Sequence, residues 1–442
     1  MSTQDETKLL GRFELISIAV GNVIGGGIMS VVGVAIGLTG RSVALALVLS
    51  GILTFISILP KSFAAATVRM NGGEYSLATL LGGEFFAGVY IAFWLTNFFG
   101  ASLYCTSFAQ YFEMLVPGLN PSLVALALLA IFYVLNILGI KVAAKAQNYM
   151  VVILIAALLL FSFFGFGHVK PGFFQQPDFM RNGFIGIMYA AALMNFACGG
   201  AGHIVSFGKQ SKNPTRDIPI SIVIASLVVT VIYAMVAIVA AGVLPISEVE
   251  GQSLAKVAFE VLPYPLYLFF IVGGAMIALA TSLNALMGWL PPPIVQACED
   301  GWLPKKFGES SKRFGTPHWI LTFIFVMAGL FIVAGWDVGD IATVGTFLAN
   351  AGTLVVVITL IRLPKVLESK WKKSIFHVSD WIYKIIWFAA LIVTIVFEYF
   401  LFDILSTGQK YSLVAFTLIA MAYSYLMIRR KNLTIDTSFE ED

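Results

Sequence analysis

Charged side chains are scarce in this sequence. Asp, Glu, Lys and Arg make up 12% of its 442 residues, whereas 59% of the residues are hydrophobic. Soluble domains carry about 25% charged and about 45–50% apolar residues, so the composition excludes an ordinary soluble domain and indicates a protein embedded in lipid. The formal net charge is only +3, and the basic residues follow the topology described below. We therefore expect no nucleic-acid partner.

Cysteine and the usual catalytic combinations are also missing. Cys105, Cys198 and Cys298 lie far apart in the chain, without disulfide or metal-ligand spacing. No set of Ser, His and Asp resembles a nucleophilic triad, and no His/Glu spacing resembles a metal site. We expect no metal, no cofactor and no enzyme activity. No cleavable signal peptide is evident, because the polar N-terminus leads directly into a long apolar segment.

Long hydrophobic runs, by contrast, are abundant. A helix needs roughly 20 apolar residues to cross a bilayer, and the sequence predicts twelve such segments. Their approximate bounds are 12–36, 42–68, 85–112, 121–140, 146–167, 183–207, 219–243, 265–290, 318–335, 340–361, 380–402 and 411–428.

The distribution of basic residues predicts the orientation of these segments. With the N-terminus in the cytoplasm, 22 of the 27 Lys and Arg residues lie on the inner side and the other five lie outside, as the positive-inside rule requires. The sequence thus predicts a multi-pass plasma-membrane protein, of a prokaryotic cell membrane, with cytoplasmic tails at 1–11 and 429–442. Its oligomeric state is left open.

Two segments carry unusual clusters of glycine. The first contains GNVIGGGI (21–28) in its middle, and the sixth contains NFACGGAGH (195–203) in its second half. Paired glycine-interrupted spans in corresponding positions indicate the central site of a transporter. The first and sixth segments are five apart, as expected if 12–167 and 183–361 form two inverted repeats. Residues 380–428 then add two further helices.

The alternative is a close-packing seam, because small residues four apart let membrane helices approach one another. Gly21 and Gly25 have that spacing, but Gly25, Gly26 and Gly27 are consecutive and surround the helix, which favours a break. A break exposes N–H donors that attract an anion and carbonyl groups that attract a cation. Two facing breaks therefore match the zwitterion of an α-amino acid.

Ordered motifs then resemble a known family, the amino acid–polyamine–organocation (APC) transporters. GNVIGGGI is similar to their first-helix motif, and NGGEY (71–75) to the loop after their second helix. Further resemblances follow in order over about 300 residues: NILGIK (136–141), SKNPTRDIP (211–219), EDGWLP (299–304) and GTP (315–317).

The resemblance implies a fold and a set of site residues. The fold is an all-α membrane protein of twelve transmembrane helices with a LeuT-like inverted repeat of five plus five helices, discontinuous helices 1 and 6, and two C-terminal helices. The implied function is secondary active transport of an amino acid or related amine, as an exchanger or a proton-coupled symporter. The substrate-binding candidates are Gly21, Asn22, Ile24, Gly25, Gly26, Gly27, Phe196, Ala197, Cys198, Gly199, Gly200 and Asn284.

A few further residues are candidates for gating or coupling. Phe196 matches an aromatic residue that packs over the substrate in the family, and His203 follows the sixth-segment glycines. His203 could bind a proton or act as a structural hydrogen-bonding group. Trp94 and Asn97 are pocket or gate candidates, although ordinary helix packing explains them as well.

The absence of charge around the predicted site bears on the substrate. No carboxylate follows the sixth-segment glycines, and no Lys or Arg was placed inside the core. A dication would need a counter-charge in a low dielectric, so we expect a neutral amino acid or a closely related amine. The alternative function is a transporter-like amino acid sensor without net transport, which the short predicted tails disfavour.

Overall fold

The computed structural model describes residues 10–68, 72–138, 143–430 and 433–435. This part of the chain is helical and contains no β-strand; Leu10 and Ser211 form an isolated parallel bridge. The predicted all-α class is thus confirmed. Helices satisfy their own backbone hydrogen bonds, which a segment buried in hydrocarbon requires.

The bounds of the helices follow in chain order. The first half of the chain forms α2 (Arg12–Val23), α3 (Gly26–Thr39), η1 (Gly40–Ser42), α4 (Val43–Thr67), α5 (Glu74–Leu77), η2 (Ala78–Gly82), α6 (Glu84–Leu95), α7 (Phe98–Leu115), α8 (Pro121–Leu138), α9 (Ala143–Phe166) and η3 (Phe173–Gln175). The second half forms α10 (Gly183–Cys198), η4 (Gly199–Gln210), α11 (Pro214–Gly242), α12 (Ile246–Val249), α13 (Ala255–Val261), α14 (Tyr264–Leu268), η5 (Phe269–Met276), α15 (Ile277–Trp289), α16 (Pro291–Glu299), α17 (Lys305–Gly308), α18 (His318–Val333), α19 (Val338–Leu360), α20 (Leu363–Val366), α21 (Glu368–Lys373), α22 (Asp380–Ile404) and α23 (Thr407–Arg429).

Nine helices in the described ranges are long and apolar enough to cross a membrane. The longest of them, Arg12–Thr67, spans the first two expected segments, and two shorter apolar helices, Met150–Phe166 and His318–Val333, fall on the fifth and ninth. The count of twelve crossings, the two inverted repeats at 12–167 and 183–361 and the cytoplasmic tails stay predictions. Residues 1–9, 431–432 and 436–442 of the tails lie outside the described residues.

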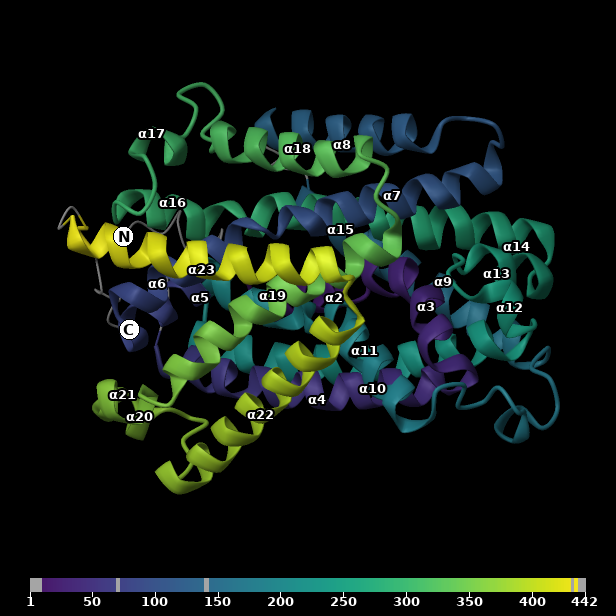
Figure 1. Ribbon diagram of the computed structural model, residues 1–442, viewed down its shortest axis with the longest axis horizontal. Coiled ribbons are helices and arrows are strands. Elements are labelled where there is room, and N and C mark those ends of the chain that lie inside the picture. The colour runs from purple at the N-terminus through teal and green to yellow at the C-terminus, as the bar shows by residue number, and fades with distance from the viewer. Residues whose placement is uncertain (1–9, 69–71, 139–142, 431–432, 436–442) are drawn as a thin grey trace.

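The long helices run roughly side by side in one bundle (Figure 1). At its centre, α3 and α4 pack against α10, and α4 packs against α11. The pair α8 and α18 lies along one edge, and α23 lies along α6. The helix α22 crosses α4 and α10 obliquely and runs alongside α19. The glycine-rich stretches of the first and sixth segments therefore meet in the interior.

The first segment is broken where the sequence predicts. The α-helix α2 ends at Val23, and α3 begins at Gly26. Between them Ile24 has ψ 72° and Gly25 has φ −132° and ψ −142°, values that no α-helix allows. The predicted discontinuity of this helix is thus confirmed.

The sixth segment differs from the expected open break. Its α-helix α10 ends at Cys198, and the chain continues as the 3₁₀ helix η4, with a non-helical residue only at Phe207. A 3₁₀ helix still forms internal i→i+3 hydrogen bonds, so this segment leaves fewer free backbone groups than the first. A Cβ added at Gly200 would lie 2.3 Å from the Asn22 carbonyl oxygen. Gly200 thus allows close approach of this segment to the first.

The three consecutive prolines 291–293 lie where one helix ends and the next begins. The helix α15 ends at Trp289, and α16 begins at Pro291 with proline in its first turn. Proline is well tolerated there because the first N–H groups of a helix have no partner within it.

Several motifs that are distant in the sequence pair with one another in space. Tyr75 of NGGEY donates a hydrogen bond to Asp300 of EDGWLP, and burial together with this carboxylate raises the pKa of Tyr75 far above its ordinary value. Thr316 of GTP donates to the Ile137 carbonyl oxygen in NILGIK at 2.8 Å. These motifs therefore hold the helix ends together. Asn71 and residues 139–141 of two motifs lie outside the described residues.

Candidate functional site

A cavity of about 110 Å³ lies in the interior, beside the break in the first segment. A single water needs about 10–15 Å³ by this measure, so the space admits several waters or a small ligand. Residues from α2, α4, α5, α6, α7, α10, α15 and α19 surround it, together with η4. The cavity thus lies between the two halves of the chain.

The structure brings some of the predicted site residues to this cavity. Those that line it are Asn22, Trp94, Asn97, Phe196, Gly199, Gly200 and His203. The remaining candidates do not appear in the lining: Gly21, Ile24, Gly25, Gly26, Gly27, Ala197, Cys198 and Asn284. Most of that second group packs the helices around the break.

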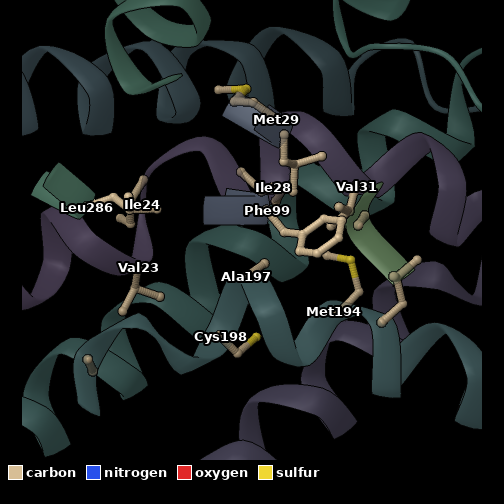
Figure 2. Close-up of a cluster of buried hydrophobic side chains, with 14 of the residues drawn as sticks. Val23, Ile24, Ile28, Met29, Val31, Phe99, Met194, Ala197, Cys198 and Leu286 are labelled. Atoms are coloured by element: carbon tan, nitrogen blue, oxygen red, sulfur yellow. The ribbon is translucent and has the colours of Figure 1, made fainter. Parts of the chain in front are cut away.

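The apolar side chains on either side of the break pack against the sixth segment. Figure 2 shows Ile28, which follows the break, above Ala197 of the sixth segment, whereas Ile24, within the break, lies beside Leu286. A Cβ at Gly27 would lie 2.7 Å from the Cα atom of Ala197. Glycine at this position lets the two segments approach to backbone contact, so Gly27 serves close packing, whereas the seam expected from the spacing of Gly21 and Gly25 stays a prediction.

Tertiary contacts cap the free backbone groups of the break. The Gly26 N–H donates to the Ser282 hydroxyl at 2.8 Å, and the Tyr233 hydroxyl donates to the Val23 carbonyl oxygen. The side-chain amide nitrogen of Asn22, Nδ2, is also buried and has no hydrogen-bond partner among the described residues. An orphaned buried donor costs free energy, and a ligand carboxylate in the cavity would satisfy it.

A buried ion pair lines the cavity and was not expected. Lys61 Nζ lies 2.8 Å from Glu74 Oε2 and 3.2 Å from the Thr353 hydroxyl. The Lys61 and Glu74 side chains are 4% and 7% exposed. The sequence interpretation assigned Lys61 to the charges at the membrane surface and placed no cation in the core, which is wrong. Lys61 follows Pro60 in an otherwise apolar stretch of α4, and this isolated charge was the available signal.

An aromatic cluster forms the wall next to this ion pair. The His203 ring stacks on Trp289 at 4.3 Å between centroids, and Trp94 lies edge-on to Trp289 at 5.2 Å. Trp94 Nε1 donates to the Leu290 carbonyl oxygen, and the His203 Nδ1 atom has no partner among the described residues. The hydrogen bond to Leu290 fixes the Trp94 indole, whereas the His203 imidazole has a ring nitrogen available beside the cavity.

Two aromatic rings lie over the break. Phe196 and Tyr104 are 5.9 Å apart between ring centroids, and a Cβ added at Gly26 would lie 2.3 Å from the Tyr104 ring. Both rings line the cavity. Their position fits the gate predicted for Phe196, and that gating role stays a prediction.

Asn284 lies elsewhere. It is absent from the cavity lining, and its amide oxygen accepts a hydrogen bond from Asn136 at 3.0 Å. This contact joins α15 to α8, so the geometry favours a helix-packing role for Asn284 over substrate binding.

Further polar residues complete the cavity; Asn195 opens the sixth-segment glycine motif, and the other four lie on α4 and α19. They are Thr54, Ser57, Asn195, Asn350 and Thr353. Ser, Thr and Asn are routine in membrane helices, so no sequence signal separated these residues from others of their type. Their convergence depends on how the helices pack.

The chain matches a family model described as amino acid permease over residues 10–423. The chain belongs to this family. It is also 27% identical to the methylthioribose transporter of Bacillus subtilis, with 80% of each chain covered. It is 26% identical to the branched-chain amino acid permease BcaP of the same organism, covering 79% of this chain and 80% of that one.

A plant relative extends the range of substrates named among these proteins. The cationic amino acid transporter 2 of Arabidopsis thaliana is 26% identical over 79% of this chain and 59% of its own. Together the family and its members are APC-superfamily transporters, not enzymes. This amino acid permease is therefore a multi-pass membrane protein involved in amino acid transport.

Proposed function

We propose that this permease is a secondary active transporter that moves a neutral amino acid, or a closely related amine, across the plasma membrane by alternating access, as an exchanger or a proton-coupled symporter. The single observation that carries the proposal is the cavity at the break in the first segment, whose charged lining residues neutralise one another. Asn22, Phe196, Gly199 and Gly200 form the proposed substrate contacts.

The ion pair supports a neutral substrate. Glu74 is the acidic residue and Lys61 the basic residue in the lining, and they bind each other. A substrate with a charged side chain would need an uncompensated opposite charge in this low-dielectric space. The substrate's own ammonium and carboxylate groups are left to polar groups such as the Asn22 amide.

The names of relatives point in different directions. They include a branched-chain amino acid permease, a methylthioribose transporter and a cationic amino acid transporter. The neutral balance of the cavity favours the first two kinds of substrate for this chain. Methylthioribose, an uncharged sugar thioether, belongs in the test panel for that reason.

Transport by purified protein in proteoliposomes tests the proposal directly. Vesicles loaded with a mixture of unlabelled amino acids should take up labelled neutral amino acids, with saturation and competition among them. The panel should also contain Lys, Arg, Asp, Glu and methylthioribose. Preference for a charged amino acid would contradict neutrality, and saturable binding without flux of any compound would favour the sensor alternative.

A further inference from the structure

Four polar side chains form a hydrogen-bonded chain that leads out of the cavity. The Thr54 hydroxyl donates to Asn195 Oδ1 at 2.8 Å, and Asn195 Nδ2 donates to Asn350 Oδ1 at 3.4 Å. Asn350 Nδ2 then donates to Glu398 Oε2 at 2.7 Å. The first three residues line the cavity, whereas Glu398 lies on α22, outside the proposed repeats.

The direction of the bonds is uniform. Each donor in the chain points toward Glu398, so the carboxylate is the terminal acceptor. Asn350 Nδ2 also donates to the Thr394 carbonyl oxygen on α22 at 3.0 Å, which fixes the orientation of its amide. Bonds to an ionised acceptor are stronger than neutral ones, and aligned bonds in a low dielectric strengthen one another. Ionisation of Glu398 therefore stabilises this hydrogen-bonded chain of side chains.

Charged groups on the neighbouring helices are paired with other residues. On α4, Lys61 binds Glu74, and on α19, Asp340 accepts from Gln409. On α22 itself, the Asp403 carboxylate accepts a hydrogen bond from Tyr189 of α10. Lys410 of α23 donates to the Asp403 carbonyl oxygen.

The other titratable groups on these helices either have another contact or lie far from Glu398 along the chain. Cys198 lies at the end of α10, and Tyr399 packs edge-on to Phe400. Asp380, Tyr383 and Lys384 lie 14 or more residues before Glu398 on α22, which is roughly 21 Å of helix. Glu398 thus accepts a hydrogen bond from Asn350 of the cavity wall and has no basic partner among the described residues.

We propose that Glu398 is a proton-binding site that couples protonation to occupancy of the central cavity through Asn350 and Asn195. The inference rests on the proposed transport function. Protonation turns the terminal carboxylate into a neutral acid, which weakens the last bond of the chain and frees the Asn350 and Asn195 amides to reorient toward the cavity. By linkage, a substrate that bonds to these amides changes the proton affinity of Glu398 by the same factor.

Access for the proton follows from the position of Glu398. It lies six residues before the end of α22 at Ile404, or about 9 Å along the helix axis. In this proposal Glu398 exchanges its proton from this end of α22 and not through the cavity.

The test measures the apparent KM for substrate counterflow in proteoliposomes as a function of pH, with equal pH on both sides. The wild-type KM should change with pH, and Glu398→Gln should abolish this pH dependence. Asn350→Ala leaves the carboxylate in place but removes the link, and it should also abolish the dependence. Asp403→Asn on the same helix is the matched control and should keep the wild-type profile.

Three outcomes would overturn the proposal: a wild-type KM that does not vary with pH, a wild-type pH profile in folded Glu398→Gln or Asn350→Ala, or loss of the profile in Asp403→Asn. Loss of all counterflow in both folded variants would also overturn it, because it would assign these residues to binding rather than coupling. A wild-type protein without any amino acid counterflow would instead contradict the proposed function.

Discussion

The adjacent residues Gly199 and Gly200 have different surroundings. A Cβ at Gly200 would overlap the backbone of Asn22, whereas a Cβ at Gly199 would meet only the Thr54 methyl group, at 4.0 Å. Both line the cavity. Gly200 is therefore required for packing of the two segments, and Gly199 leaves space that a ligand can occupy.

This difference makes Gly199→Leu a test of the site. The new side chain should fill the cavity and weaken substrate binding by roughly 1–3 kcal/mol, the usual cost of overpacking, or about five- to 150-fold. The effect is measured as the apparent affinity for the best-transported amino acid in a competition uptake assay. Gly288→Leu, at an exposed position of α15 with no atom within 4 Å of an added Cβ, is the matched control. Equal activity of the two variants would exclude Gly199 from the site.

The Lys61–Glu74 pair predicts a double-mutant result. Removing one partner of a buried pair leaves an uncompensated charge and costs about 3–5 kcal/mol. Lys61→Met and Glu74→Gln should each lower the unfolding temperature in detergent more than the double variant does. If the three variants lower it additively, the two side chains do not interact as the geometry indicates.

At the scale of the element, the interrupted first segment depends on a neighbouring helix. The free N–H at the start of α3 donates to Ser282 of α15, which acts as an N-cap supplied from a distant part of the chain. Loss of a Ser cap costs about 0.5–2 kcal/mol, so the break is stable only in the assembled bundle.

Ser282→Ala should therefore lower thermal stability by an amount in this range and weaken amino acid binding, because α3 is then less well positioned. Unfolding temperature with and without the amino acid reports both effects. Ser412→Ala, which removes a hydroxyl bonded to the Gly408 carbonyl oxygen on exposed α23, is the control. A smaller loss for Ser282→Ala than for Ser412→Ala would contradict the capping role.

At the scale of the whole molecule, ion pairs hold the two ends of the first segment. Arg12, at the start of α2, lies 2.7 Å from Asp217 of α11. Arg41, just past α3, lies 2.8 Å from Asp178 and also donates to the Ala241 carbonyl oxygen. Alternating access requires the two ends of a transporter to open in turn, and these contacts oppose opening at opposite ends.

Weakening one end should thus shift the population toward the state open on that side. Asp217→Asn and Asp178→Asn should lower the apparent KM on opposite faces of oriented vesicles. Because these pairs are partly exposed, the expected effect is about 0.5–1 kcal/mol, or about two- to fivefold. Sided uptake assays measure it, and improvement on the same face in both variants would refute the arrangement.

The sequence alone predicts the helical class and the break in the first segment, because both depend on local composition, and the ordered motifs give the resemblance to the family. Long apolar runs require helices in lipid, and consecutive glycines at 25–27 weaken one of them. The 3₁₀ conformation of the sixth segment could not be predicted locally, because glycine permits both an open break and a 3₁₀ helix. The close contact of Gly200 with Asn22 favours the 3₁₀ form.

The composition of the cavity was decided by tertiary structure. Hydrophobicity assigns Lys61 to a membrane edge, yet packing brings it to Glu74 at the start of α5 and to Thr353 of α19. The same packing aligns Thr54, Asn195 and Asn350 with Glu398. Thr54 and Asn195, Asn195 and Asn350, and Lys61 and Thr353 are each more than a hundred positions apart in the sequence. These contacts depend on helix positions and angles that no local pattern encodes.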